Sequence, residues 1–89
     1  MDYAVLLHPR VADFLRKADP NLMIRITGHL KRLRDSPARK GERLKHTEFW
    51  RLKIGDHRAI YEIDAKSRRV IVLFIGHRHR VYDDFSRLL

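Results

Sequence analysis

Hydrophobic residues in the first half of the chain recur at the spacing of an α-helix. One stripe at i, i+3, i+4 and i+7 comprises Val11, Phe14, Leu15 and Ala18. A second stripe comprises Leu22, Met23, Ile26, Leu30 and Leu33. The pairs His8-Pro9 and Asp19-Pro20 precede the two stripes, and proline suits the first position of a helix. The pattern predicts a strand over residues 3–7 followed by two helices joined as a hairpin.

The second half of the chain changes to a period of two, which is typical of strands. Over residues 49–54 the apolar Trp50, Leu52 and Ile54 alternate with residues that include Arg51 and Lys53. Further strands are predicted over 57–64 and 69–76, separated by turns at 55–56 and 65–67. Residues 37–47 are expected to form a basic loop. The pattern leaves open whether residues 83–89 form a helix.

These elements predict one α+β domain over residues 1–89. The helix hairpin should pack on one face of a mainly antiparallel sheet of about four strands, since helical stripes need an apolar surface to cover. The alternation places Arg51 and Lys53 on the opposite, partly open face. A length of 89 residues allows a single small core.

Composition and charge narrow the class of protein. There is no cysteine, which excludes a disulfide scaffold, and the longest apolar run, over residues 70–75, is too short to span a membrane. The N-terminus lacks a basic leader, so we expect a cytoplasmic protein with no membrane association. The net charge of +9 favours a polyanionic partner. Nucleic acid is the first candidate, and an acidic protein is the alternative.

Most familiar catalytic motifs are absent from the sequence. There is no phosphate-binding GxxxxGK[ST] loop and no GxGxxG. His77 and His79, with His57 on a neighbouring strand, form only a weak metal-binding pattern, because no further ligand stands at suitable spacing. We therefore expect neither a metal ion nor a cofactor.

Cationic residues from three predicted strands offer a different chemistry. Arg51, Lys53, Arg58 and Arg78 could form a floor that binds phosphate, with the phenol of Tyr82 nearby. RNA cleavage requires deprotonation of a 2′-OH, stabilisation of charge on the phosphate oxygens and protonation of the leaving 5′-oxygen. Cations can stabilise the charge on the phosphate oxygens. They also favour the phenolate of a neighbouring tyrosine, which could remove the proton of the 2′-OH. The same residues could equally be solvated charges that protect a sheet edge.

Two sequence blocks carry a resemblance to a known family. WRLKIGDHRAIY at residues 50–61 and GHRHRVY at residues 76–82 follow the predicted helix hairpin. In this order they resemble the RelE branch of the RelE/ParE toxin superfamily. The resemblance implies a RelE-like microbial RNase fold and a ribosome-dependent endoribonuclease that cleaves mRNA in the A site by metal-independent attack of the 2′-OH. It also implies a RelB-like antitoxin partner that neutralises the toxin.

The resemblance also assigns roles to individual residues. Tyr82 would be the base, Lys53 and Arg58 would stabilise the transition state, and Arg78 would hold the phosphate. Arg51 stands where the best-known member of the family has lysine. Since arginine donates a proton poorly, we hypothesise that His77 or His79 protonates the leaving group. The wider RNA-binding surface would comprise Arg43, Lys45, His77 and His79.

Two alternatives remain on the same fold. A ParE-like gyrase poison would act by binding a protein and would not need a clustered phosphate floor. A non-catalytic basic RNA-binding module would keep the charge and tolerate loss of the Tyr82 hydroxyl.

Overall fold

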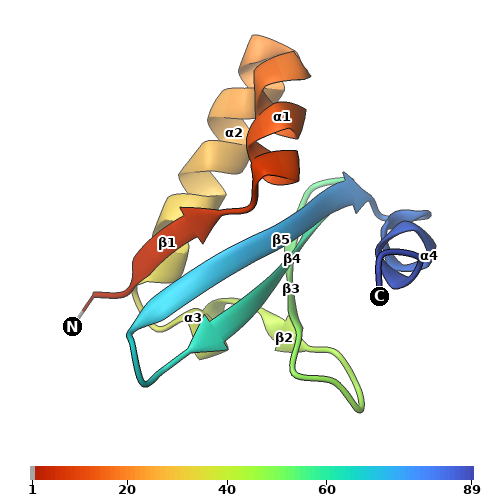
Figure 1. The fold of residues 1–89 in the computed structure, drawn as a ribbon. Coiled ribbons are helices and arrows are strands. Elements are labelled where there is room, and N and C mark those ends of the chain that lie inside the picture. Colours follow the sequence, from red (N-terminus) through yellow and green to blue (C-terminus); the bar gives the residue numbers. More distant parts are fainter. Residues whose placement is uncertain (1) are drawn as a thin grey trace.

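The computed structural model describes residues 2–89, which form four α-helices, one short 3-10 helix and five strands. The N-terminal part comprises β1 (Ala4–Leu7), α1 (Pro9–Lys17), α2 (Pro20–Lys31), η1 (Arg32–Arg34) and α3 (Pro37–Lys40). The C-terminal part comprises β2 (Glu42–Arg43), β3 (Trp50–Ile54), β4 (His57–Asp64), β5 (Arg69–His77) and α4 (Val81–Ser86). Figure 1 shows the α1–α2 hairpin rising beside β1 and β5, with α4 at the far end of β5.

The strands form one sheet in the order β1-β5-β4-β3-β2. β1 pairs parallel with β5, and the other neighbours pair antiparallel. The predicted α+β architecture is confirmed, but the sheet has five strands where about four were expected. The additional strand, β2, lies in the segment predicted to be a loop, and so does α3. Two residues are too few to show alternation, so no pattern in the sequence could reveal β2.

Both helices of the hairpin begin as their sequences predict. The His8 imidazole Nδ1 accepts a hydrogen bond from the Arg10 backbone N–H at 3.1 Å, ahead of Pro9. The Asp19 carboxylate accepts one from the Asn21 N–H at 3.0 Å, ahead of Pro20. These caps satisfy N–H groups that have no partner within their helices.

The main core lies between the helix hairpin and one face of the sheet. Buried members from the helices include Val11 and Ile26, and those from the sheet include Leu52, Ile54 and Tyr61. The alternation of β3 therefore points its apolar residues to the face on which the sequence placed them.

A second, smaller core occupies part of the opposite face. Val81 and Phe85 of α4 pack with Ile60 of β4 and with the partly buried Phe49 and Phe74. The C-terminal segment, which the sequence left open, thus forms a helix and covers part of the face expected to be open. Within residues 2–89, no helix is long and apolar enough to cross a membrane.

Candidate active site

Three of the predicted site cations lie on the sheet face opposite the helix hairpin. Arg51 and Lys53 alternate with the buried Leu52 on β3, and Arg58 of β4 stands directly opposite Lys53 in the register. Directly paired residues of antiparallel strands project to the same face, so the three side chains share one surface. On the other side of Arg58, its partner in β5 is Gly76, which adds no side chain to that surface.

Tyr82 joins this surface from α4. Its hydroxyl oxygen accepts a hydrogen bond from Arg51 Nη1 at 3.0 Å, and the guanidinium carbon lies 5.9 Å from the centre of the tyrosine ring. The bond to Tyr82 raises the pKa of Arg51 above its usual value, so the guanidinium stays charged. A cation is thus fixed directly on the phenolic oxygen of Tyr82.

Arg58 and Arg78 meet the turn that joins β3 and β4. Arg58 Nη1 donates to the carbonyl oxygens of Gly55 and His57, both at 2.8 Å. The backbone N–H of Arg78 donates to the Asp56 carbonyl at 2.8 Å, and its Nε lies 3.8 Å from the Asp56 carboxylate. The turn therefore holds both arginines at one end of the cationic surface.

Glu42 is a member of the site that sequence reasoning missed. Its carboxylate lies 3.3 Å from Lys53 Nζ and 3.5 Å from Arg51 Nη2. The hydrogen bond and charge of Lys53, with a smaller contribution from Arg51, lower the pKa of Glu42. The position of Glu42 opposite Arg51 depends on the pairing of β2 with β3. No signal in the sequence indicates that pairing.

The two histidines proposed as proton donors lie elsewhere. His77 stands opposite His57 in the register, and the His57 ring packs against Phe14 of α1 at 5.9 Å between centres. His77 therefore faces the helix side of the sheet, with its ring 6.0 Å from that of His57, and the His79 ring lies 5.1 Å from His77. The structure does not bring His77 together with Arg51, Lys53 and Arg58. Among residues 2–89, no group of three histidine, aspartate or glutamate side chains is arranged to hold a metal ion.

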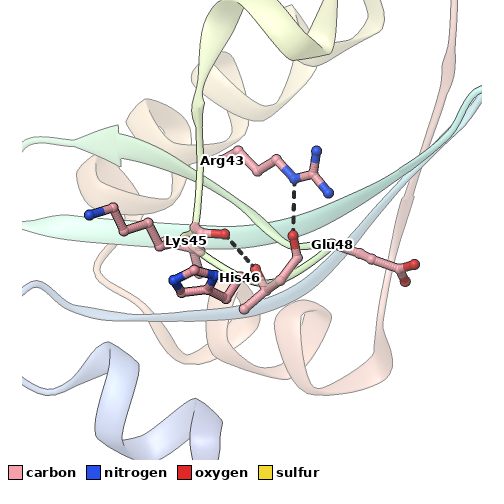
Figure 2. A pocket seen from close by; sticks show the side chains of 6 residues that line it. Arg43, Lys45, His46 and Glu48 are labelled. Carbon is pink, nitrogen blue, oxygen red and sulfur yellow. Dashed lines mark hydrogen bonds between the residues drawn. The ribbon is translucent and has the colours of Figure 1, made fainter.

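Of the predicted RNA-binding residues, Arg43 ends the edge strand β2 and Lys45 lies in the loop that follows it. Residues 43–48 line a hollow of about 460 Å³. Arg43 Nε donates to the Thr47 carbonyl at 3.0 Å, and the Thr47 hydroxyl donates to the Leu44 carbonyl at 2.8 Å. Figure 2 shows the Arg43 and Lys45 side chains extending away from each other. Arg43 is paired with Trp50, on the face opposite Arg51.

Comparison with known proteins places the chain in a family. Residues 5–82 match the family model described as ParE toxin of type II toxin–antitoxin system, parDE. No curated protein matches the sequence.

Several solved structures of RelE proteins have a similar fold. RelE in the archaeal RelE–RelB complex from Pyrococcus horikoshii is 24% identical with a TM-score of 0.78, over 91% of this chain and 100% of that one. The matching protein in the toxin–antitoxin complex RelBE2 from Mycobacterium tuberculosis is 23% identical with a TM-score of 0.77, and the match covers 88% of this chain and 100% of that one. A mutant of E. coli RelE in the free state is 20% identical with a TM-score of 0.76, and the match covers the whole of both chains. The family model matches most of this chain, and the fold is shared with the RelE structures. The chain therefore belongs to the RelE/ParE superfamily of toxins from type II toxin–antitoxin systems.

Proposed function

We propose that this toxin is a metal-independent, ribosome-dependent endoribonuclease that cleaves mRNA in the A site and so inhibits translation. The observation that carries the proposal is the hydrogen bond from Arg51 to the Tyr82 hydroxyl, next to Lys53 and Arg58 on the same sheet face. A phenol held against a guanidinium, with further cations on the same sheet face, suits a phosphodiester better than a neutral ligand.

In the proposed mechanism, Tyr82 acts as the phenolate that removes the proton of the 2′-OH. The 2′-oxygen then attacks the phosphorus while the bond to the 5′-oxygen breaks and that oxygen takes a proton from water, which gives a 2′,3′-cyclic phosphate and a 5′-hydroxyl end. Lys53, Arg58 and Arg78 would stabilise the charge that develops on the phosphate oxygens. Because His77 faces the other side of the sheet, the geometry supports no role for it in protonating the 5′-oxygen.

Dependence on the ribosome follows from the weak acid–base groups of the site. The carboxylate in contact with Lys53 and Arg51, that of Glu42, has a lowered pKa and is a poor proton donor at neutral pH, so the chemistry depends on accurate placement of the 2′-OH. Orientation of reactants contributes up to about 7–11 kcal/mol in the best cases. Free RNA, which is not held in the attacking geometry, should therefore be a poor substrate.

We also propose a RelB-like antitoxin as the partner that neutralises the toxin. Four of the structurally similar proteins were crystallised in RelBE or RelE–RelB complexes. The net charge of +9 suits an acidic partner of this kind.

The second candidate is a ParE-like gyrase poison, which the family-model match favours. That activity would require neither the Arg51–Tyr82 bond nor the exposed cations beside it. A non-catalytic RNA-binding module of the same fold would likewise not need the hydroxyl of Tyr82.

The test uses purified ribosomes that hold an mRNA with a defined A-site codon, in a buffer whose Mg²⁺ keeps the ribosomes assembled. We expect cleavage within that codon and 2′,3′-cyclic phosphate ends. Loss of a general base typically slows a reaction about 10²- to 10⁴-fold, and we expect a loss in this range for Tyr82→Phe. Tyr3→Phe, the control, changes a tyrosine that packs against Arg68 and should leave the rate unchanged.

Each alternative predicts a different result in the same experiment. Intact mRNA together with inhibition of gyrase and DNA breakage would favour the ParE-like activity. Binding to ribosomes without cleavage, unaffected by Tyr82→Phe, would indicate the RNA-binding module. Cleavage that appears only after Mn²⁺ or Zn²⁺ is added to assembled ribosomes would overturn the metal-independent mechanism.

A further inference from the structure

The free toxin already holds an anion at the position proposed for RNA phosphate. The Glu42 carboxylate contacts both Lys53 and Arg51, at 3.3 Å and 3.5 Å. Carboxylate and phosphate oxygens accept the same hydrogen bonds from ammonium and guanidinium groups. The two anions therefore compete for these cations.

We propose that Glu42 is an internal counterion that occupies the phosphate position on Arg51 and Lys53 and is displaced when RNA binds. The inference rests on the proposed function, because it takes these two cations as phosphate ligands. It adds a residue that sets how strongly the site binds single-stranded RNA.

The backbone around Glu42 is held in place from the helix side of the sheet. Glu42 pairs with Arg51 in the sheet, and the preceding Gly41 lies against the buried Tyr61. The Tyr61 hydroxyl donates to the Pro37 carbonyl at 2.8 Å, which ties α3 to the sheet just before β2. The Glu42 side chain is 58% exposed and can turn away from the cations, whereas its backbone is fixed.

The state of the carboxylate favours a counterion over a general base. Its two cationic neighbours lower the pKa of Glu42, so it is ionised at neutral pH. A general base is most effective when its pKa lies near the working pH, and a weakly basic carboxylate is a poor proton acceptor. A permanently ionised group, however, is well suited to balance two cations.

The consequence is that part of the cationic surface is neutralised until RNA displaces the carboxylate. A phosphate must break two ion pairs before it gains its own contacts with Arg51 and Lys53. Removal of the Glu42 charge should therefore strengthen binding and increase its dependence on salt.

The experiment measures binding directly, without cleavage. A short, fluorescently labelled 2′-O-methyl RNA cannot be cut, because its 2′-oxygen is blocked, and its affinity is followed by anisotropy between about 50 and 200 mM salt. The variants are wild type, Glu42→Gln and Glu62→Gln. Glu62, in β4, has the same charge but is in contact with neither Arg51 nor Lys53 in the ion pairs found among residues 2–89. The control therefore separates loss of this particular carboxylate from a change in net charge.

We expect Glu42→Gln to bind about three- to tenfold more tightly, as suits the loss of two exposed ion pairs. The salt dependence should steepen by about 0.7 in the slope of log K against log salt for one additional phosphate contact on a single strand. Glu62→Gln should change the affinity less than twofold.

Equal effects of the two variants, or no change in Glu42→Gln, would overturn the inference. A large loss of cleavage on ribosomes by Glu42→Gln, at wild-type affinity for the blocked RNA, would also overturn it by making Glu42 a base. If Glu42→Gln unfolds, Glu42→Ala replaces it. If the wild type fails to cut mRNA, the proposed function fails, whereas the binding comparison still decides the role of Glu42.

Discussion

The contact between Gly41 and Tyr61 gives a sharp test of how β2 is held at the edge of the sheet. A Cβ atom at position 41 would lie 2.2 Å from the Tyr61 hydroxyl oxygen and 2.4 Å from the Arg51 carbonyl oxygen. Both distances are far below ordinary van der Waals contact. Gly41 has a φ of −120°, which any residue adopts, so glycine is required here for space and not for backbone conformation.

The expected losses in the free energy of unfolding follow from these two contacts and from the hydrogen bond of Tyr61. Gly41→Ala must move β2 away from the sheet, because Tyr61 is fully buried and cannot turn aside. Overpacking of this kind costs about 1–3 kcal/mol. Tyr61→Phe leaves the Pro37 carbonyl without its hydrogen bond, which costs about 1–3 kcal/mol when the site is buried. Burial raises the pKa of Tyr61 to about 12, so the hydroxyl keeps its proton and donates at neutral pH.

The two substitutions should not be additive. Tyr61→Phe removes one of the two obstacles to an alanine at position 41, so the double variant should be at least about 1 kcal/mol more stable than the sum of the single variants predicts. The assay is urea unfolding of the four proteins. For a domain of this size, each kcal/mol also shifts the melting temperature by about 4–8 °C.

Gly28 provides a matched control for the glycine substitution. A Cβ atom there would meet nothing within 4 Å, and the residue lies inside α2. Gly28→Ala should therefore stabilise the protein by about 0.5–1 kcal/mol. Additivity of Gly41→Ala and Tyr61→Phe within about 0.5 kcal/mol, or a stabilising Gly41→Ala, would refute the packing argument.

Two further predictions concern α4 and the helix side of the sheet. Phe85→Ala removes the main apolar contact of α4 with the Phe49 and Phe74 rings. Cleavage should therefore fall at least as far as in Tyr82→Phe, and hydrogen exchange at residues 81–86 should accelerate. Unchanged hydrogen exchange would contradict this prediction. Burial, reinforced by the charge of His77, lowers the pKa of His57 in the folded state. The unfolded chain then binds more protons, so the urea midpoint should fall as pH drops from about 7 to about 5, and His57→Gln should reduce that fall; an equal fall in both proteins would contradict the prediction.

The fold was largely predictable because its main elements carry long periodic signals. The helical stripes ending at Ala18 and Leu33, and the alternation around Leu52, each extend over several residues. The structure confirms them except at Met23, which is exposed. The second core was not predictable in the same way. It depends on contacts between α4 and residues far away in the sequence, such as Phe49 and Ile60.

The candidate site likewise has contacts that the sequence could predict and contacts that it could not. Lys53 and Arg58 could be placed together because a tight turn joins their two strands and fixes their register. The sequence could not show on which face His77 lies, because the side-chain direction at the end of β5 depends on an irregularity in its pairing with β4 near Ile60 and Tyr61. Glu42 was missed because its strand has only two residues. The sequence thus reveals contacts made across long, regular pairings and conceals those made by short edge segments.

Arg51 connects the two parts of the site that the sequence could not place. Its Nη1 donates to Tyr82 in α4, and its Nη2 lies near Glu42 in β2. A planar guanidinium can engage two partners at fixed angles, whereas a lysine ammonium at this position would carry the charge without that geometry. The departure from lysine, which the family resemblance brought out, therefore has a physical reason. One arginine orients the phenol and, in the free toxin, shares the carboxylate with Lys53, so RNA that displaces Glu42 would meet a cation already aligned with Tyr82.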